Sequence, residues 1–269
     1  MVRRALAEDV GPGDATTAAL GLADKPARAG IVVKEAGIIC GLDVAAEVFA
    51  ALGGSGKFDK KTDDGAQAKP GEVAAKLEGF AGPLLAGERT ALNFLQRLSG
   101  IATLTANFFE AVGPDGPAIM DTRKTAPGLR GLEKYAVRSG GGVNHRMGLY
   151  DAILIKDSHK RLVGGAGEAV ALARSNNPDK LQIVCEAETV DEAVAAEEAG
   201  ADVVMFDNFT PEQIKEALGK MAGKALTEVS GGVTLENVAG FAALGVDRIS
   251  VGVLTHSARA LDVSMEIIV

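Results

Sequence analysis

The second half of the chain repeats one pattern six times: a short apolar run followed by an amphipathic segment with helix-capping residues. Each run is too short for a buried helix, and several are rich in β-branched residues, which is typical of buried strands. The intervening segments carry helix signals, such as Thr210 followed by Pro211 at one start and Gly200 at one end. The predicted strands are residues 118–120, 152–155, 181–185, 202–206, 225–229 and 247–251. Strands that alternate with helices form right-handed βαβ units, so this half is predicted to be an α/β fold with a parallel sheet.

Polar residues follow every one of these runs, at the strand ends where an α/β barrel keeps its active site. They are Asp121 to Lys124, Lys156 with Asp157, Glu186 with Glu188, Asp207 with Asn208, Ser230 to Gly232, and Gly252. Ordinary strand ends collect Ser, Asn and Thr, whereas this set is rich in acids and cations, so a barrel is favoured over an open doubly wound sheet. The repeating part is short for a full eight-stranded barrel, which takes ~250 residues. An incomplete α/β barrel is therefore predicted.

The first hundred residues follow a different pattern. Two alternating, β-like stretches at residues 27–42 and 71–82 are split by the polar segment 57–72, which is rich in Lys and Asp. This pattern predicts an α+β domain in which the polar segment is a solvated hairpin connection. A long helix with apolar residues at helical spacing is predicted from Glu88 to Val112, where it bridges the two domains.

The C-terminal nine residues alternate again and are predicted to return to the sheet of the first domain. The chain is accordingly divided into an N-terminal α+β domain (1–105) that includes the start of the bridging helix, a barrel domain (106–258) and a C-terminal strand (259–269).

Charge is distributed unevenly along the chain. The whole sequence carries −8, with a pI near 5.1, which argues against nucleic acid or an anionic membrane as the main partner. The segment from Thr122 to Lys160 nevertheless carries eight Lys or Arg against three Asp or Glu. The predicted partner of this cationic segment is a small, highly charged anion.

Several features bear on where the protein works. Cys40 and Cys185 lie in apolar runs and are too few and too far apart for a disulfide framework, so we expect buried free thiols. The N-terminal residues lack the apolar region of a signal peptide, and no stretch approaches the ~18 apolar residues of a membrane span. The expected location is the cytoplasm.

Two kinds of anion site are indicated by residue type. Ser230-Gly231-Gly232 and Ser250-Val251-Gly252 follow the last two predicted strands, where barrels commonly bind phosphate through backbone N–H groups. Arg123 and Lys124 are adjacent, and His145 and Arg146 follow a run of three glycines. An Arg fork pairs with a carboxylate and Lys provides a point charge for phosphate, so two different anions are expected together.

Each of the other candidates has a structural alternative. His145 could be a hydrogen-bonded structural histidine, and Lys156 either a buried lysine paired with Asp157 or a Schiff-base amine. Glu188 and Asp207 could be ligands of Mg²⁺, acceptors for sugar hydroxyls or helix-capping acids. Arg89 falls in the first turn of the predicted helix, where a cation opposes the helix dipole at a cost of roughly 0.3–1 kcal/mol, and this mildly favours an anionic partner.

A set of motifs covers essentially the whole chain. These are TRKTAPGLR, GGGVNHRMGLYDAILIKDSH, CEAE, MFDNF, EVSGGVTLENV and ISVGVLTH, together with LAEDVGPGDATT near the start and GERTALNFLQRLSGIA on the predicted helix. The combination resembles the quinolinate phosphoribosyltransferase (decarboxylating) family, also called nicotinate-nucleotide pyrophosphorylase. The resemblance implies a sandwich-like N-terminal α+β domain, an incomplete parallel barrel of six or seven strands, and a head-to-tail homodimer or higher oligomer.

The resemblance also implies the reaction, that of a pentosyltransferase in de novo NAD biosynthesis. Such an enzyme transfers phosphoribose from 5-phosphoribosyl 1-pyrophosphate to quinolinate and yields nicotinate mononucleotide, pyrophosphate and CO₂, with Mg²⁺ but no organic cofactor. Carboxylate binding is then implied for Arg123, His145 and Arg146, with Arg89 contributed by the neighbouring subunit. Lys124 and Lys156 are implied to face phosphoribosyl pyrophosphate or to lie between the two substrates. Contacts with ribose hydroxyls and Mg²⁺, direct or indirect, are implied for Glu188 and Asp207. A cradle for the 5′-phosphate is implied for Ser230, Gly231, Gly232 and Gly252.

Two other functions compete with this interpretation. A paralogue associated with molybdenum transport shares the architecture and binds or acts on another anion, although Arg89, Arg123, His145 and Arg146 together argue against it. A barrel aldolase that uses Lys156 would form a Schiff base with a carbonyl substrate. The aldolase does not call for three arginines around a carboxylated ring.

Overall fold

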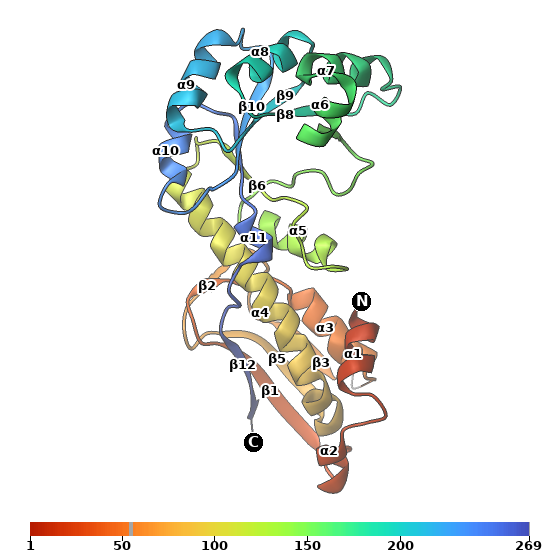
Figure 1. Ribbon diagram of the computed structural model, residues 1–269. Helices are drawn as coiled ribbons and strands as arrows, with labels where there is room; N and C mark the ends of the chain where they lie inside the picture. Colours follow the sequence, from red (N-terminus) through yellow and green to blue (C-terminus); the bar gives the residue numbers. More distant parts are fainter. Residues whose placement is uncertain (54–55, 269) are drawn as a thin grey trace. The chain divides into compact units, whose positions relative to one another are not determined.

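The computed structural model describes residues 1–53 and 56–268 (Figure 1). The chain divides into two compact units, each built from more than one segment. The first unit comprises Met1–Ala106, Pro127–Gly141 and Ala258–Val269, and the second comprises Asn107–Ala126 and Gly142–Ser257. Residues 54 and 55, and residue 269 of the predicted C-terminal strand, lie outside the described part of the chain. No helix in the described part is long and apolar enough to cross a membrane.

The first unit contains a four-stranded antiparallel sheet in the order β12-β1-β5-β3. Its strands are β1 (Pro26–Val33), β3 (Lys57–Lys60), β5 (Val73–Phe80) and β12 (Val263–Ile268), and β2 (Gly37–Ile38) pairs separately with β4 (Gln67–Ala68). The helices are α1 (Val2–Asp9), α2 (Ala15–Ala19), α3 (Leu42–Ala51), α4 (Ala81–Val112) and α5 (Arg130–Ser139), and the unit boundary at Ala106 falls within α4. The alternating C-terminal segment therefore lies beside β1, although it is more than 180 residues away in sequence.

The prediction that the polar segment 57–72 is only a hairpin connection is wrong. Residues Lys57–Lys60 form β3, which pairs with β5, and Gln67–Ala68 form β4. Lysine and aspartate are uncommon in strands, but β3 is an edge strand, where charged side chains reach solvent and protect the open edge from pairing.

Helix α4 begins at Ala81, seven residues before the predicted start at Glu88. Gly82 and Gly87, which resemble helix breakers in the sequence, are required by packing. A Cβ at Gly82 would lie 3.0 Å from the carbonyl oxygen of Ala23, and one at Gly87 would lie 2.9 Å from the Phe49 ring. Arg89 is therefore not in the first turn of the helix, and the predicted conflict of its charge with the helix dipole does not exist.

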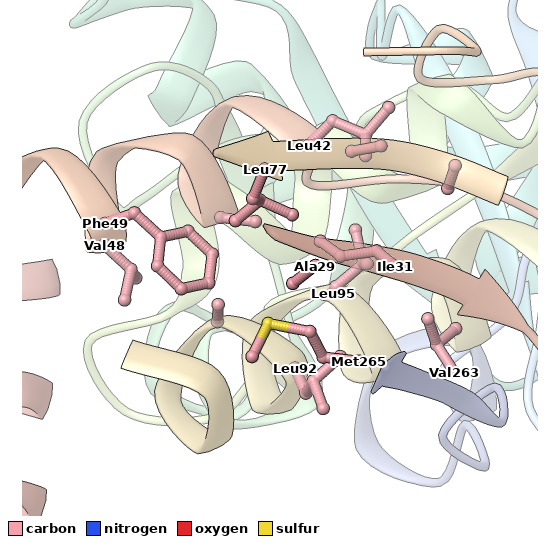
Figure 2. Close-up of a cluster of buried hydrophobic side chains, with 14 of the residues drawn as sticks. Ala29, Ile31, Leu42, Val48, Phe49, Leu77, Leu92, Leu95, Val263 and Met265 are labelled. Atoms are coloured by element: carbon pink, nitrogen blue, oxygen red, sulfur yellow. The ribbon is translucent and has the colours of Figure 1, made fainter. Parts of the chain in front are cut away.

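The core of the first unit lies between the sheet and its helices (Figure 2). Alternate residues Ala29, Ile31 and Val33 of β1 are fully buried, as strand geometry requires. They belong to the same cluster as Leu92 and Leu95 of α4. Leu42, Val48 and Phe49 of α3, Leu77 of β5, and Val263 and Met265 of β12 complete the part that Figure 2 labels.

Helix α5 belongs to this unit, whereas the sequence placed residues 127–141 in the barrel domain. Its contacts explain the difference. Tyr135 Oη donates to Asp64 at 2.9 Å, and Arg97 Nε of α4 donates to the fully buried Glu133 at 2.8 Å. At Gly140 a Cβ would lie 2.2 Å from the carbonyl oxygen of Ala102, so the chain at this point approaches α4 closely only because it is glycine.

The second unit contains a six-stranded parallel sheet in the order β6-β11-β10-β9-β8-β7. Its strands are β6 (Ala118–Met120), β7 (Ile153–Ile155), β8 (Ile183–Ala187), β9 (Val203–Asp207), β10 (Leu226–Ser230) and β11 (Arg248–Ser250). The helices are α6 (Asp157–Val163), α7 (Ala166–Ser175), α8 (Val190–Glu198), α9 (Pro211–Lys220), α10 (Val238–Ala242) and α11 (Val253–His256). All six predicted strands are present within two residues of their predicted ends, and the predicted incomplete α/β barrel is confirmed.

The sheet is open because β6 and β7 are its two edges, which a closed barrel would pair. Beside β6, Val143 makes an isolated parallel bridge with Met120. This bridge brings the start of the loop that carries His145 and Arg146 to the end of β6. Arg123 and Lys124 follow one of the two bridged segments, and His145 and Arg146 follow the other.

Side chains alternate between the two faces of the sheet along each strand, and this alternation places the candidate site residues on one face. Leu154 of β7, Val184 of β8, and Val203 and Met205 of β9 pack together on one face of the sheet. Successive residues of a strand point to opposite faces, so the residue two positions after each apolar one points the same way. Lys156, Glu186 and Asp207 follow at this spacing and reach the carboxyl ends of the strands.

The two cysteines, Cys40 and Cys185, are free and buried as predicted.

Candidate active site

A cavity of about 570 Å³ lies in the second unit at the carboxyl ends of the strands. Its lining includes side chains from or directly after all six strands of the sheet. The lining residues are Thr122, Arg123, Lys124, His145, Arg146, Leu154, Lys156, Glu186, Met205, Asp207, Asn208, Ser230, Gly231, Gly232 and Ser250. Most of the predicted site residues are therefore brought together, and Arg89, Glu188 and Gly252 are the ones that do not line this cavity.

Arg123 and Arg146 form a pair of neighbouring, half-buried guanidinium groups. Burial, and then the charge of Arg123, lower the pKa of Arg146 below its ordinary value. Arg146 donates from one terminal nitrogen to the carbonyl of Ala152 at 3.0 Å, whereas its buried Nε has no hydrogen-bond partner among the described residues. Because a buried donor without a partner is costly, this arrangement favours a bound anion.

His145 is held by the loop that contains it. The fully buried Asp121 accepts the backbone N–H of His145 at 2.9 Å and the side-chain amide of Asn144 at 2.6 Å. The Nδ1 atom of His145 accepts the backbone N–H of Arg146 at 2.8 Å. A nitrogen that accepts a hydrogen bond carries no proton, so this geometry assigns the ring proton to Nε2. His145 is therefore fixed in one tautomer and presents an N–H donor.

Lys156, just after β7, forms an ion pair with Glu186 of the neighbouring strand β8, with 2.5 Å between Nζ and a carboxylate oxygen. The predicted alternative of a buried lysine paired with Asp157 is wrong, because Lys156 is half exposed and Asp157 pairs with Arg161 at 3.0 Å. Lys124 is exposed at the cavity, and its carbonyl accepts the hydroxyl of Thr255 at 2.7 Å.

The structure brings Glu186 into the cavity, whereas the sequence analysis favoured Glu188. The two residues are on the same face of an extended chain, but β8 ends at Ala187 and Glu188 lies beyond it. The Glu188 carboxylate lies 3.7 Å from Nζ of Lys160 on α6, and its backbone N–H donates to Glu192 at 2.8 Å. Sequence alone carried one signal for Glu186, its place directly after the apolar run 181–185, and that signal was not enough to choose it.

A backbone turn after β10 faces the end of β9. Gly231 has φ +95° and Gly232 has φ +61°, in the left-handed region that favours glycine. A Cβ at Gly231 would lie 2.1 Å from Oδ1 of Asn208 and 3.1 Å from its backbone nitrogen, so no side chain fits there. The backbone N–H of Asn208 donates to the carbonyl of Ser230 at 2.8 Å. This open turn of small residues suits a phosphate group.

Gly252 lies just outside the cavity lining, at the start of α11. A Cβ at this position would lie 3.4 Å from Cδ of Lys124 and 3.2 Å from Nε2 of His256. Its absence leaves room for the Lys124 side chain.

Asp207 is the carboxylate best suited to a divalent cation. Its side chain has no hydrogen-bond or ion-pair partner in the part of the chain that the structure describes, whereas Glu186 is engaged by Lys156. Residues 1–53 and 56–268 contain no group of three acidic, His or Cys side chains that could hold a metal on their own. Mg²⁺ is often bound through one or two carboxylates and the phosphates of a substrate, so the residues fit a substrate-borne Mg²⁺ and not a metal held by protein alone.

Comparisons of the sequence and of the structure match nearly the whole chain to the same group of proteins. Residues 14–99 match the N-terminal domain and residues 101–266 the C-terminal domain of quinolinate phosphoribosyl transferase. A Bacillus subtilis protein named probable nicotinate-nucleotide pyrophosphorylase [carboxylating] is 44% identical over 260 residues, which cover 97% of this chain and 90% of that protein. The Mycobacterium leprae nicotinate-nucleotide pyrophosphorylase [carboxylating] is 41% identical, with 99% and 95% covered. The crystal structure of NadC from Streptococcus pyogenes superposes with a TM-score of 0.94 at 42% identity, with 98% of this chain and 94% of that chain covered. This chain belongs to the quinolinate phosphoribosyl transferase family.

Proposed function

We propose that this protein transfers phosphoribose from 5-phosphoribosyl 1-pyrophosphate to quinolinate and releases pyrophosphate and CO₂, leaving nicotinate mononucleotide for NAD biosynthesis. The observation that carries the proposal is the pair of half-buried guanidinium groups of Arg123 and Arg146, which face the same cavity as the glycine turn at Gly231 and Gly232. The two guanidinium groups suit carboxylates, and the glycine turn suits a phosphate. The names of the similar proteins support the same activity.

Quinolinate binding is assigned to the cationic side of the cavity. Its two carboxylates pair with Arg123 and Arg146, which supply the planar forks that carboxylates prefer. The N–H of His145 at Nε2 donates to one of these carboxylates. A dianion in this place gives the buried Nε of Arg146 its missing partner.

Phosphoribosyl pyrophosphate is assigned to the remaining polar residues of the cavity lining. The turn from Ser230 to Gly232 binds the 5′-phosphate, and Glu186 and Asp207 accept hydrogen bonds from the ribose hydroxyls. Lys124 and Lys156 face the pyrophosphate. Mg²⁺, held by Asp207 together with substrate oxygens, would neutralise charge on the leaving pyrophosphate.

The chemistry needs no protein nucleophile. The ring nitrogen of quinolinate forms a bond to the anomeric carbon while the bond from that carbon to the pyrophosphate oxygen breaks. The positive charge that develops on the ribose is stabilised by the carboxylates of Glu186 and Asp207. The quaternary nitrogen then withdraws electrons, so the bond to the adjacent carboxylate breaks, CO₂ leaves, and the electron pair left on the ring carbon takes up a proton.

A coupled assay for pyrophosphate and nicotinate mononucleotide tests this function, with quinolinate and nicotinate compared as acceptors in the presence of phosphoribosyl pyrophosphate and Mg²⁺. Turnover of quinolinate alone is expected, because nicotinate lacks the second carboxylate that both arginines need. Turnover of neither acceptor by folded protein would overturn the proposal and direct attention to the binding of other oxyanions, including molybdate.

We further propose that the protein works as a homodimer in which Arg89 of one subunit completes the site of the other. Arg89 is exposed on α4 in the first unit and does not line the cavity of its own chain. The family resemblance implies that Arg89 is contributed by the neighbouring subunit, and an exposed arginine can reach one.

Mixed dimers test the sharing of Arg89. The Arg89→Ala and Lys124→Ala homodimers should each be nearly inactive. Mixing them through reversible dissociation should restore activity, because a heterodimer contains one site without either substitution. Different affinity tags on the two variants show independently that heterodimers have formed, and Arg28→Ala, at another exposed arginine of the first unit, should stay active as a homodimer. If the purified heterodimer of Arg89→Ala and Lys124→Ala is as inactive as its parents, the sharing hypothesis is wrong.

A further inference from the structure

A buried carboxyl group that the proposed chemistry does not use lies beneath the cavity. Glu228, on β10, is completely buried. Its Oε1 accepts the hydroxyl of Ser250 from the neighbouring strand β11, and its Oε2 is buried with no hydrogen-bond partner among the described residues. An ionised carboxylate in such a place would leave half of its hydrogen-bonding capacity unused at a substantial cost.

Glu228 lies one residue layer below the cavity lining. Ser230, two positions later on the same face of β10, lines the cavity, and so does Ser250. Nε2 of His145, which also lines the cavity, lies 3.6 Å from Oε1 of Glu228. A charge on Glu228 would therefore act on the same groups that face the quinolinate carboxylates.

The charged groups around Glu228 come from several elements. Arg248 is opposite it on β11, Glu186 comes from β8, and His145 comes from the loop after residue 142. On β9 its register partner is Met205, which does not titrate. Burial raises the pKa of Glu228 to about 7; the Ser250 hydrogen bond and the charge of Arg248 act to lower it, and the charge of Glu186 raises it. Nδ1 of His145 accepts the backbone N–H of Arg146, so this geometry places the ring proton on Nε2, the atom nearest to Glu228.

Charge balance in the cavity links this group to the ligand. The lining contains the cations Arg123, Lys124, Arg146 and Lys156 and the carboxylates Glu186 and Asp207. With Glu228 neutral, two positive charges remain in excess in this lining, which favours anionic ligands. An ionised Glu228 would cancel one of them from a buried position, where solvent screens it poorly.

We propose that Glu228 is a positioning residue whose carboxyl group must hold a proton for a dianionic aromatic acid to bind above it, so that binding of the anion takes up a proton. The inference rests on the proposed function, since it assigns quinolinate to the cavity. Glu228 does not touch the substrate in this proposal. It acts through Ser250 and His145 and through the field at the two arginines.

Calorimetric titration of quinolinate tests the linkage without turnover. The wild-type protein and Glu228→Gln are titrated at pH 6, 7 and 8, in pairs of buffers that differ in ionisation enthalpy, so that proton uptake is measured directly. If only the protonated fraction binds, Kd of the wild type should rise about tenfold between pH 6 and pH 8 relative to that of Glu228→Gln. The wild type should take up close to half a proton more at pH 7 than the variant does, because about half of Glu228 is ionised there.

Two further variants keep the test decisive. Glu212→Gln removes an exposed glutamate of α9 and should behave as the wild type does at every pH. Ser250→Ala removes the hydrogen bond that holds the pKa of Glu228 down, so the midpoint of the pH dependence should move to higher pH. Equal pH dependence and equal proton uptake in the wild type and Glu228→Gln would overturn the inference. Failure of the wild type to bind quinolinate at any pH would instead overturn the proposed function.

Discussion

Replacing Arg146 with alanine should lower kcat/KM for quinolinate by about thirtyfold to five-thousandfold, because truncating one partner of a desolvated charge pair costs about 2–5 kcal/mol. Arg146 faces the cavity beside Arg123, and its Nε is buried with no partner among the described residues. The loss should be seen with quinolinate and not with phosphoribosyl pyrophosphate, whose KM should change little. The measurement is initial-rate kinetics with each substrate varied in turn.

Two comparisons make the result specific. Arg146→Lys keeps the charge but loses the planar fork, so it should recover only part of the activity. Arg161→Ala removes an exposed arginine of the same unit that pairs with Asp157 on α6, and it should leave both kinetic constants near those of the wild type. An Arg146→Ala protein with an unchanged KM and kcat for quinolinate would show that the carboxylates bind elsewhere.

The barrel could be predicted from the sequence because two independent patterns agreed. The lengths of the six apolar runs indicated strands, and the charged residues after them indicated one common end of a parallel sheet. Lys156, Asp207 and Ser230 are each at or just after the last residue of a strand, and all three line the cavity. Both patterns, the lengths of the apolar runs and the charged residues after them, are local in sequence, so they can be recognised without knowledge of the tertiary contacts.

The start of α4 could not be predicted, because the relevant information lies in distant residues. Gly82 and Gly87 suggest a turn on propensity alone, since glycine destabilises a helix interior by roughly 1 kcal/mol. The structure shows that Ala23 and Phe49 occupy the space that side chains would need at these positions. The assignment of α5 to the first unit could not be predicted either, because it depends on contacts of this helix with the distant residues Asp64 and Arg97.

The choice between Glu186 and Glu188 failed for a related reason. Both residues have the same parity on an extended chain, so alternation assigns them to one face. Their difference is that β8 ends between them and that Lys160 of α6 lies near Glu188. The burial of Glu228 was likewise hidden, because an acid within a strand gives no sign of whether Ser250 on the neighbouring strand will cover it.

Replacing Glu197 with alanine should lower the free energy of unfolding by about 3 kcal/mol, because hydrogen bonds to a charged group contribute about 1.5–3 kcal/mol and a buried donor would lose its partner. Glu197 is on α8 and is only 3% exposed. Its carboxylate accepts the backbone N–H groups of Ala222 at 2.5 Å, Lys224 at 2.7 Å and Ala225 at 3.2 Å. These residues lead into β10, whose far end carries the Ser230 to Gly232 turn. Urea denaturation measures the loss, and Glu198→Ala, at the exposed neighbour, should change the stability by less than about 0.5 kcal/mol.

The stability that Glu197 contributes should depend on pH, because its carboxylate accepts these hydrogen bonds in the charged form. Burial raises the pKa of Glu197, but the hydrogen bonds from Ala222, Lys224 and Ala225 outweigh it and hold the pKa below the ordinary value of 4.5. The unfolded state therefore binds a proton first as the pH falls, and the stabilisation is fully present above about pH 5 and is lost as the pH drops through the folded-state value. Glu197→Gln, which keeps the shape without the charge, should be less stable than the wild type at pH 7, and the difference should shrink as the pH falls below 4.5 and through the lowered folded-state pKa. A stability difference that stays constant from pH 7 to pH 4 would show that Glu197 stabilises the strand through packing and not through its charge.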